Sequence, residues 1–282
     1  MSIYPKEDNF INSPSGARGM EIQLEQAGKR FNRDWIFRKL TYTFQQGNTY
    51  AITGVNGSGK STLLQSIAGS TNISEGKVLY FLGGESQKSE DRRQESEERR
   101  EKREDRRQRT EDRSLKSEDR EPKTDDGTEQ SAIANLKSEI SNQKSAISSE
   151  DIYQHISITA PYLELIEEMS VTEFLQFHAS FKPLMLSIPE IISIIGLEKA
   201  AQKQMRYYSS GMKQRVKLAQ AVFSTAPILL LDEPCTNLDK NGFELYHQLI
   251  ENYCSNKLVI VCSNDENEMD FCLNRLSIAD YK

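Results

Sequence analysis

The chain has 282 residues, 36 of them basic and 42 acidic, and its formal net charge is −6 at pH 7. This charge gives no general attraction to nucleic acid, so no nucleic-acid partner is expected. No apolar run approaches the roughly 20 residues that span a bilayer, and no secretory signal pattern is present. The four cysteines lack Cys-x-x-Cys spacing, which predicts buried thiols in a cytoplasmic protein.

Two segments differ in composition from the rest of the chain. Residues 1–19 are polar and contain Gly, Pro and Ser, which predicts a disordered N-terminal tail. Between Glu85 and Glu129, 31 of 45 residues are charged and Leu115 is the only large apolar residue. Such a stretch buries too little apolar surface to offset the entropy lost on ordering. We therefore expect residues 84–150 to be a charged low-complexity insertion in a single domain spanning 20–282.

A phosphate-binding loop is the first chemical motif in chain order. The alternating run Met20–Leu24 predicts a first strand, and Thr49–Thr53 predicts a second. The next residues match GxxxxGK[ST] and lead into a helix-like pattern at 63–69: Gly54, Val55, Asn56, Gly57, Ser58, Gly59, Lys60, Ser61 and Thr62. The glycines let backbone N–H groups turn toward a phosphate, and the helix adds its positive end. We expect Lys60 to contact the β- and γ-phosphates and Ser61 to bind Mg²⁺.

A second motif pairs two carboxylates with a buried strand. Four aliphatic residues from Ile228 run into Asp232, Glu233 and Pro234, as in a parallel strand covered on both faces. Ligands of open α/β sheets bind at the carboxyl ends of the strands. Asp232 is therefore expected to help hold Mg²⁺, and Glu233 to act as the base that polarises the attacking water.

A third stretch separates one class of phosphate-loop ATPase from the others. Tyr208-Ser-Ser-Gly-Met-Lys-Gln-Arg215 precedes a helix-like pattern at 216–223, and Asn237-Leu-Asp239 follows the two carboxylates. With these motifs in this order, the chain resembles the ATP-binding cassette (ABC) ATPase family over residues 20–83 and 150–275. The serine-rich signature is most similar to that of single-cassette exporter subunits. The resemblance implies an α/β P-loop NTPase fold with a RecA-like core, an antiparallel β-subdomain and an α-helical signature subdomain near 163–222.

The resemblance also implies partners and further binding residues. Ser209 and Gly211 are expected to address the γ-phosphate of ATP held by a second cassette subunit, in a homo- or heterodimer. A separate transmembrane subunit would dock near residues 160–177 and place the chain at the inner face of the membrane. ATP and Mg²⁺ are the expected ligands. Phe31 is expected to stack on the adenine, with Trp35 as the alternative.

Two positions depart from the family pattern. Asn264 stands where a switch histidine is expected, and asparagine can donate a neutral hydrogen bond but cannot carry charge. Tyr162 stands in place of the loop glutamine that binds Mg²⁺. Because Lys60, Ser61, Asp232 and Glu233 are present, an active Mg-ATPase is still expected.

Three alternatives stay open. One is a soluble non-transport cassette of the iron–sulfur assembly type, and another is an ATP-gated binding subunit with little hydrolysis. The third is a DNA-repair ATPase with a split cassette, but such an insertion needs long apolar heptads, which this one lacks.

Overall fold

The computed structural model describes residues 19–83 and 145–282, which contain two sheets. The first sheet has the order β2-β1-β4-β5, and β1 pairs antiparallel with both β2 and β4. Its strands are β1 (Glu21–Phe31), β2 (Asp34–Gln45), β4 (Glu75–Leu82) and β5 (Ser145–Ile147). This is the antiparallel layer that the resemblance implied.

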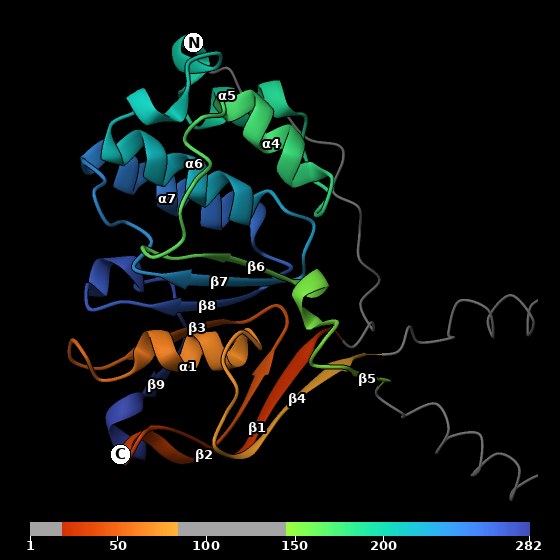
Figure 1. The fold of residues 1–282 in the computed structure, drawn as a ribbon, viewed down its shortest axis with the longest axis vertical. Helices are drawn as coiled ribbons and strands as arrows, with labels where there is room; N and C mark the ends of the chain where they lie inside the picture. The colour runs from red at the N-terminus through yellow and green to blue at the C-terminus, as the bar shows by residue number, and fades with distance from the viewer. Residues whose placement is uncertain (1–18, 84–144) are drawn as a thin grey trace, which may run out of the picture. The chain divides into compact units, whose positions relative to one another are not determined.

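The second sheet is parallel and has the order β6-β7-β8-β3-β9. Its strands are β3 (Thr49–Thr53), β6 (Ile156–Thr159), β7 (Ile228–Asp232), β8 (Leu258–Cys262) and β9 (Asn274–Ser277). Every residue of β7 and β8 is buried, because helices or the first sheet cover both faces (Figure 1). The predicted strands at 49–53 and 228–232 are confirmed at these bounds.

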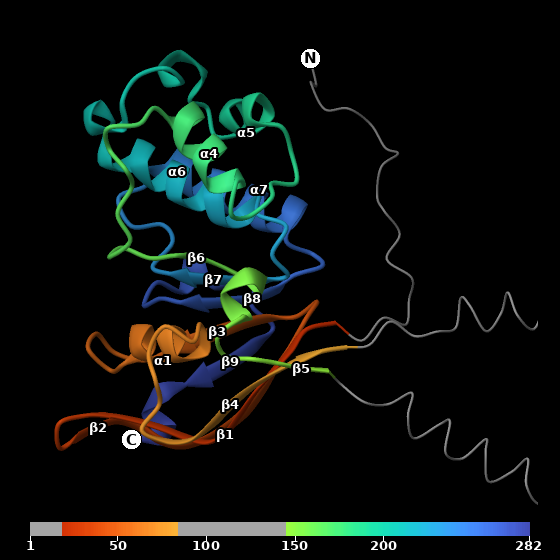
Figure 2. The ribbon, with the colours of Figure 1, turned by 45° about the vertical axis from the view of Figure 1, so that its right-hand side comes forward.

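The α-helices lie on both faces of the parallel sheet (Figures 1 and 2). Helix α1 (Lys60–Ile67) shares one face with the antiparallel sheet, and the other face carries α4 (Val171–Ala179), α5 (Ile188–Ile194), α6 (Ser210–Val222) and α7 (Lys240–Tyr253). Short 3₁₀ turns complete the described chain: η1 (Ile152–His155), η2 (Glu198–Ala200), η3 (Met205–Tyr207), η4 (Glu266–Glu268) and η5 (Ile278–Tyr281). No helix of the described ranges is long and apolar enough to cross a membrane.

Side-chain alternation along the central strands divides the core into two clusters. Leu229 and Leu231 of β7 pack with the α4–α7 layer, whereas Ile228 and Leu230 pack with α1 and the antiparallel sheet. Successive side chains of a strand point to opposite faces, so one apolar strand contributes to both clusters. The parallel sheet is therefore held from both sides, and its carboxyl ends carry the loops of the candidate site.

Polar caps begin the helices of the α4–α7 layer. Ser170 and Glu173 form a reciprocal capping box at α4, and Ser209 accepts the Met212 N–H at the start of α6. Such caps satisfy N–H groups that have no partner inside the helix. The residues at which α4 and α6 begin are therefore determined by neighbouring side chains in the sequence. Helices α4, α5 and α6 fall within the range 163–222 predicted for the signature subdomain.

The end of the predicted 84–150 insertion differs from the prediction. Residues 145–147 form strand β5, and Ile147 packs against the core cluster that α1 and the antiparallel sheet share. The last residues of the predicted insertion therefore belong to the folded domain, because this short segment completes a sheet edge. The rest of the insertion and the predicted tail up to residue 18 lie outside the described residues.

Candidate functional site

The phosphate loop joins β3 to α1, with Gly54 to Gly59 in the loop and Lys60, Ser61 and Thr62 in the first turn of the helix. Gly54, Gly57 and Gly59 have φ angles of 151°, 74° and 103°, values that L side chains rarely adopt. A Cβ atom at Gly59 would also lie 2.1 Å from Ile36 Cγ2. The loop is therefore curled tightly against β2 in a form that requires glycine.

Lys60 lies at the centre of the hydrogen bonds of this loop. Its side chain is 6% exposed, and its Nζ donates to the Gly54 carbonyl at 2.8 Å and to Asn264 Oδ1 at 2.7 Å. Asn264 Nδ2 in turn donates to Asn56 Oδ1. Asn264 thus contacts both the lysine and the tip of the phosphate loop. A residue that follows β8 therefore reaches the loop that follows β3.

Ser58 and Val55 differ in their surroundings. Ser58 Oγ is buried with no hydrogen-bond partner among the described residues, whereas Val55 is 77% exposed. A buried hydroxyl without a partner is uncommon in native proteins. It can donate to an oxygen of a phosphate held by the loop.

Asp232 closes the site from the end of β7. It is 2% exposed, and its Oδ1 is buried without a hydrogen-bond partner in the described structure. Burial raises the pKa of Asp232, while a hydrogen bond from Ser61 and the charge of Lys60 oppose that rise. A free carboxylate oxygen beside a serine hydroxyl is the oxygen-donor set that Mg²⁺ prefers. These two residues therefore fit a Mg²⁺ ion.

Glu233 follows Asp232 in a sharp turn. Its φ angle is 45°, an uncommon value for a residue with a side chain. The Glu233 N–H donates to the Cys262 carbonyl at 2.8 Å, and its own carbonyl accepts the Thr236 hydroxyl at 2.9 Å. The backbone is therefore held on both sides of this strained residue, next to Asp232. Such strain is often found at active sites.

Tyr162 lies near Asp232, in the loop after β6. The ring is 47% exposed. Burial raises the pKa of Tyr162, a hydrogen bond with Gln65 opposes that rise, and the charge of Asp232 adds to it. The phenol therefore stands near Asp232 and near Gln65 of α1, which lines the same groove.

The signature stretch contacts the backbone of the segment after Glu233. A Cβ atom at Gly211 would lie 3.1 Å from the Asn237 carbonyl oxygen, and Gln214 Nε2 donates to the Pro234 carbonyl at 2.6 Å. Ser209 is exposed and caps α6. Helix α6 and the loop after β7 therefore form one connected unit, while the roles of Ser209 and Gly211 toward a second subunit stay predictions.

The two candidates for adenine stacking lie at the β1–β2 turn. Phe31 is 51% exposed, with Lys29 Nζ 4.8 Å from its ring centroid. Trp35 has the guanidinium carbon of Arg38 at 4.5 Å and that of Arg30 at 5.6 Å. Both rings stand in basic surroundings, and which of them stacks on adenine stays a prediction.

Three residues of this region carry no motif that sequence reasoning could use. Gln65 lines the same groove as Tyr162, Cys262 Sγ approaches the Lys60 carbonyl at 3.7 Å, and Glu268 accepts the Cys235 N–H at 3.1 Å. Each is brought to the site by tertiary packing rather than by local spacing.

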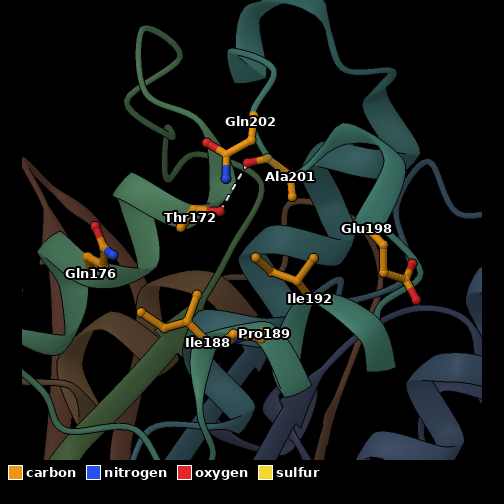
Figure 3. Close-up of a pocket in the computed structure, with 8 residues that line it drawn as sticks. All are labelled: Thr172, Gln176, Ile188, Pro189, Ile192, Glu198, Ala201 and Gln202. Carbon is orange, nitrogen blue, oxygen red and sulfur yellow. Dashed lines mark hydrogen bonds between the residues drawn. The ribbon is translucent and has the colours of Figure 1, made fainter.

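A separate pocket of about 470 Å³ lies in the helical layer (Figure 3). Ile188, Pro189 and Ile192 of α5 form one wall, and the Thr172 hydroxyl donates to the Ala201 carbonyl at 3.1 Å on the opposite side. None of the residues predicted to bind nucleotide lines it. The pocket is therefore distinct from the phosphate-loop site.

The chain is similar to known ATP-binding cassettes. A family model described as ABC transporter matches residues 37–236. The uncharacterized ABC transporter ATP-binding protein YybJ of Bacillus subtilis is 23% identical, over 89% of this chain and 89% of its own length. The cytochrome c biogenesis ATP-binding export protein CcmA of Haemophilus influenzae is 24% identical, over 88% of this chain and 90% of its own.

Solved structures agree on the fold. A putative ABC transporter ATP-binding protein from Pyrococcus furiosus superposes with a TM-score of 0.61 at 16% identity, over 93% of this chain and 99% of that structure. The α/β P-loop fold expected from the resemblance is confirmed. Since the family model covers most of the chain, the chain belongs to the ABC transporter family.

Proposed function

We propose that this chain binds and hydrolyses Mg-ATP as the ATP-binding subunit of an ABC transporter. One observation carries the proposal. Lys60, Ser61 and Asp232 come from two distant parts of the chain, all three are buried or half-buried, and Asp232 Oδ1 is left without a hydrogen-bond partner among the described residues where Ser61 and Lys60 act on its pKa. These are the residue types that phosphoryl transfer requires around the β- and γ-phosphates.

The proposed chemistry relies on positioning and on charge. The phosphate loop holds the triphosphate through backbone N–H groups, and Lys60 exchanges its bond to Asn264 for one to a phosphate oxygen. Glu233 accepts a proton from the attacking water as the water oxygen bonds the γ-phosphorus and the bond from that phosphorus to the β,γ-bridging oxygen breaks, which releases ADP and phosphate. Mg²⁺, held through Ser61 and Asp232, would neutralise charge that develops on the phosphate oxygens.

Asn264 and Tyr162 set the rate in this proposal. Asn264 can orient a γ-phosphate by a neutral hydrogen bond, but it cannot add positive charge. Tyr162 lies near Asp232 and can donate to the attacking water. Asn264 lacks the charge that a histidine can carry, and Tyr162 lacks the amide oxygen by which a glutamine binds Mg²⁺. These two residues therefore favour a second candidate, an ATP-gated binding subunit with little hydrolysis.

A second cassette and a membrane subunit complete the proposed assembly. The second cassette would bring its signature serine to the ATP held on this phosphate loop, and this chain's Ser209 and Gly211 would do the same in return. For the membrane subunit we propose a groove of about 370 Å³ beside Tyr162, lined also by Tyr153, Ile158 and Lys182. Tyr153 is 60% exposed, so an aromatic side chain faces this groove. Docking there would hold the chain at the cytoplasmic face of the membrane.

Binding and assembly measurements test the proposal. Calorimetric titration with Mg-ATP is expected to give one site per chain, lost in Lys60→Ala and retained in the control Lys240→Ala, whose lysine is exposed at the start of α7. Glu233→Gln with ATP is expected to sediment as a dimer, and with ADP as a monomer. Equal ATP affinity in Lys60→Ala and the unaltered chain would contradict the proposed site.

A further inference from the structure

Glu268 is a buried carboxylate between two loops of the candidate site. It ends turn η4, which follows β8, and it is 6% exposed. Burial raises the pKa of Glu268, and hydrogen bonds from Ser263 and from the Cys235 N–H oppose that rise. A carboxylate is costly to bury unless its hydrogen bonds compensate. Here Oε1 accepts a backbone N–H, whereas Oε2 is buried without a hydrogen-bond partner among the described residues.

The first loop that Glu268 contacts is the one after Glu233. Its Oε1 accepts the Cys235 N–H at 3.1 Å. Cys235 begins a turn in which its carbonyl accepts the Leu238 N–H at 3.0 Å and Asn237 has a φ angle of 65°. Glu268 therefore anchors the start of the segment 235–239, in which the sequence places the D-loop.

The second loop is the one that carries Asn264. The Glu268 N–H donates to the Asp265 carbonyl at 3.1 Å, and the Asp265 N–H donates to Ser263 Oγ at 2.9 Å. Asn264 lies between Ser263 and Asp265 and bonds Lys60. Through its backbone N–H, Glu268 thus contacts the neighbour of the residue that reaches the phosphate loop.

Helix α7 fixes Glu268 from behind. The hydroxyl of Tyr246, a fully buried residue, donates to the Glu268 carbonyl at 2.9 Å. The backbone of Glu268 is therefore held by the core and by the Asn264 loop, while its side chain holds the segment after Glu233. A residue that contacts both loops can couple a shift of one to the other through continuous hydrogen bonds.

We propose that Glu268 is a positioning residue that makes the Asn264 loop and the segment 235–239 move as one unit. Asn264 faces the nucleotide, and segment 235–239 would face the second cassette, so the bridge links the state of the nucleotide to the contact between subunits. The proposal rests on the proposed ATPase function. It assigns Glu268 no contact with ATP, and its effect is on geometry.

Two conservative substitutions separate geometry from charge. Glu268→Gln keeps the side-chain length and an oxygen that can accept the Cys235 N–H. Glu268→Asp keeps the charge but shortens the side chain, so it no longer reaches that N–H. If the role is to position the loop, Gln retains kcat within about threefold and Asp lowers it roughly 10- to 100-fold, the loss that a small misplacement causes.

The test measures kcat, KM and Mg-ATP affinity for Glu268→Gln, Glu268→Asp and Glu268→Ala. Glu266→Ala is the control, because Glu266 lies on the same turn but is exposed and pairs with Arg275 at 2.5 Å. The Asp and Ala variants are expected to lose kcat while ATP affinity stays unchanged, and Glu266→Ala to behave like the unaltered chain. Retention of kcat in Asp with loss in Gln would overturn the proposal, as would a parallel loss of ATP affinity.

Hydrogen exchange measured by mass spectrometry supplies a readout that does not depend on hydrolysis. In Glu268→Asp without nucleotide, peptides that cover 235–239 and 263–265 are expected to exchange faster, with those covering 54–62 unchanged. Unchanged exchange at 235–239 would overturn the proposal even if the chain hydrolyses ATP. Faster exchange in a chain without turnover would support the bridge and count against the proposed ATPase instead. If the Asp and Ala variants do not fold, loss of kcat in the folded Gln variant alone would overturn the proposal.

Discussion

The Gly59→Ala substitution places a methyl group where the phosphate loop enters α1. Gly59 has a φ angle of 103°, and the added Cβ would lie 2.1 Å from Ile36 Cγ2 on β2. Two costs follow. The backbone angle disfavours a side chain by about 1–2 kcal/mol, and forcing an extra carbon into a packed site costs about 1–3 kcal/mol. We expect a total loss of about 2–5 kcal/mol in the free energy of unfolding.

Gly57→Ala is the matched control for this substitution. Gly57 belongs to the same loop and has a φ angle of 74°, but a Cβ there meets no atom within 4 Å. It should therefore show only the backbone cost, about 1–2 kcal/mol. Removing the obstructing side chain with Ile36→Ala should relieve Gly59→Ala and leave Gly57→Ala unaffected.

Urea unfolding of the single and double variants measures these terms. Far-UV circular dichroism is the suitable signal, because the one tryptophan, Trp35, adjoins Ile36 and would itself be perturbed. The Gly59→Ala and Ile36→Ala cycle should give a coupling energy of about 1–3 kcal/mol, and the Gly57→Ala cycle nearly none. Equal destabilisation by the two alanines, or no coupling to Ile36, would refute the assigned packing.

Three further predictions follow from buried groups. Burial lowers the pKa of Lys257 to about 8 from 10.5, so between these pH values the unfolded chain binds more protons than the folded one. In urea titrations the unaltered chain should therefore gain about 3 kcal/mol of stability relative to Lys257→Met from pH 8 to 10.5. A stability difference between the two proteins that does not change with pH would contradict this. All four cysteines are buried, and burial raises the pKa of each thiol. A colourimetric disulfide reagent at pH 8 should therefore react with almost no thiol in the native chain and with four thiols in urea. Fast reaction of the native chain would show that a thiol is exposed and would contradict this. Asp232→Asn should weaken the affinity for Mg²⁺ in the presence of ATP about 10- to 100-fold, with little change in ATP binding without Mg²⁺. If calorimetry finds that ATP binding depends equally on Mg²⁺ in the variant and in the unaltered chain, Asp232 is excluded from the metal site.

The central strands and the phosphate loop could be predicted because their signals are local. The run before Asp232 is continuously apolar, as a strand buried on both faces must be, and β7 has the predicted bounds. The loop at 54–62 carries its glycines at the positions where the backbone turns. In both cases neighbouring residues determine the conformation.

Other features depend on contacts between distant residues. Strand β5 has only three residues, Ser145–Ile147, and it becomes a strand by joining the sheet edge. Glu268 belongs to the acidic stretch 265–268, whose composition predicts a solvent-exposed turn. In the folded chain, however, Glu268 is buried beside Tyr246. The place of Gln65 in the site likewise follows only from its closeness to Tyr162 in the folded chain. No spacing rule identifies a side chain whose partner lies so far away in the sequence.

Steady-state phosphate release with Mg-ATP tests the proposed ATPase most directly. The unaltered chain is expected to turn over, and Glu233→Gln to bind ATP without releasing phosphate, because it lacks the base at the end of β7. Glu244→Gln makes the same change at an exposed position on α7 and should match the unaltered chain. Phosphate release by Glu233→Gln at the unaltered rate would contradict the role of Glu233. An unaltered chain that binds ATP, dimerises and releases no phosphate would contradict the ATPase and favour the ATP-gated subunit.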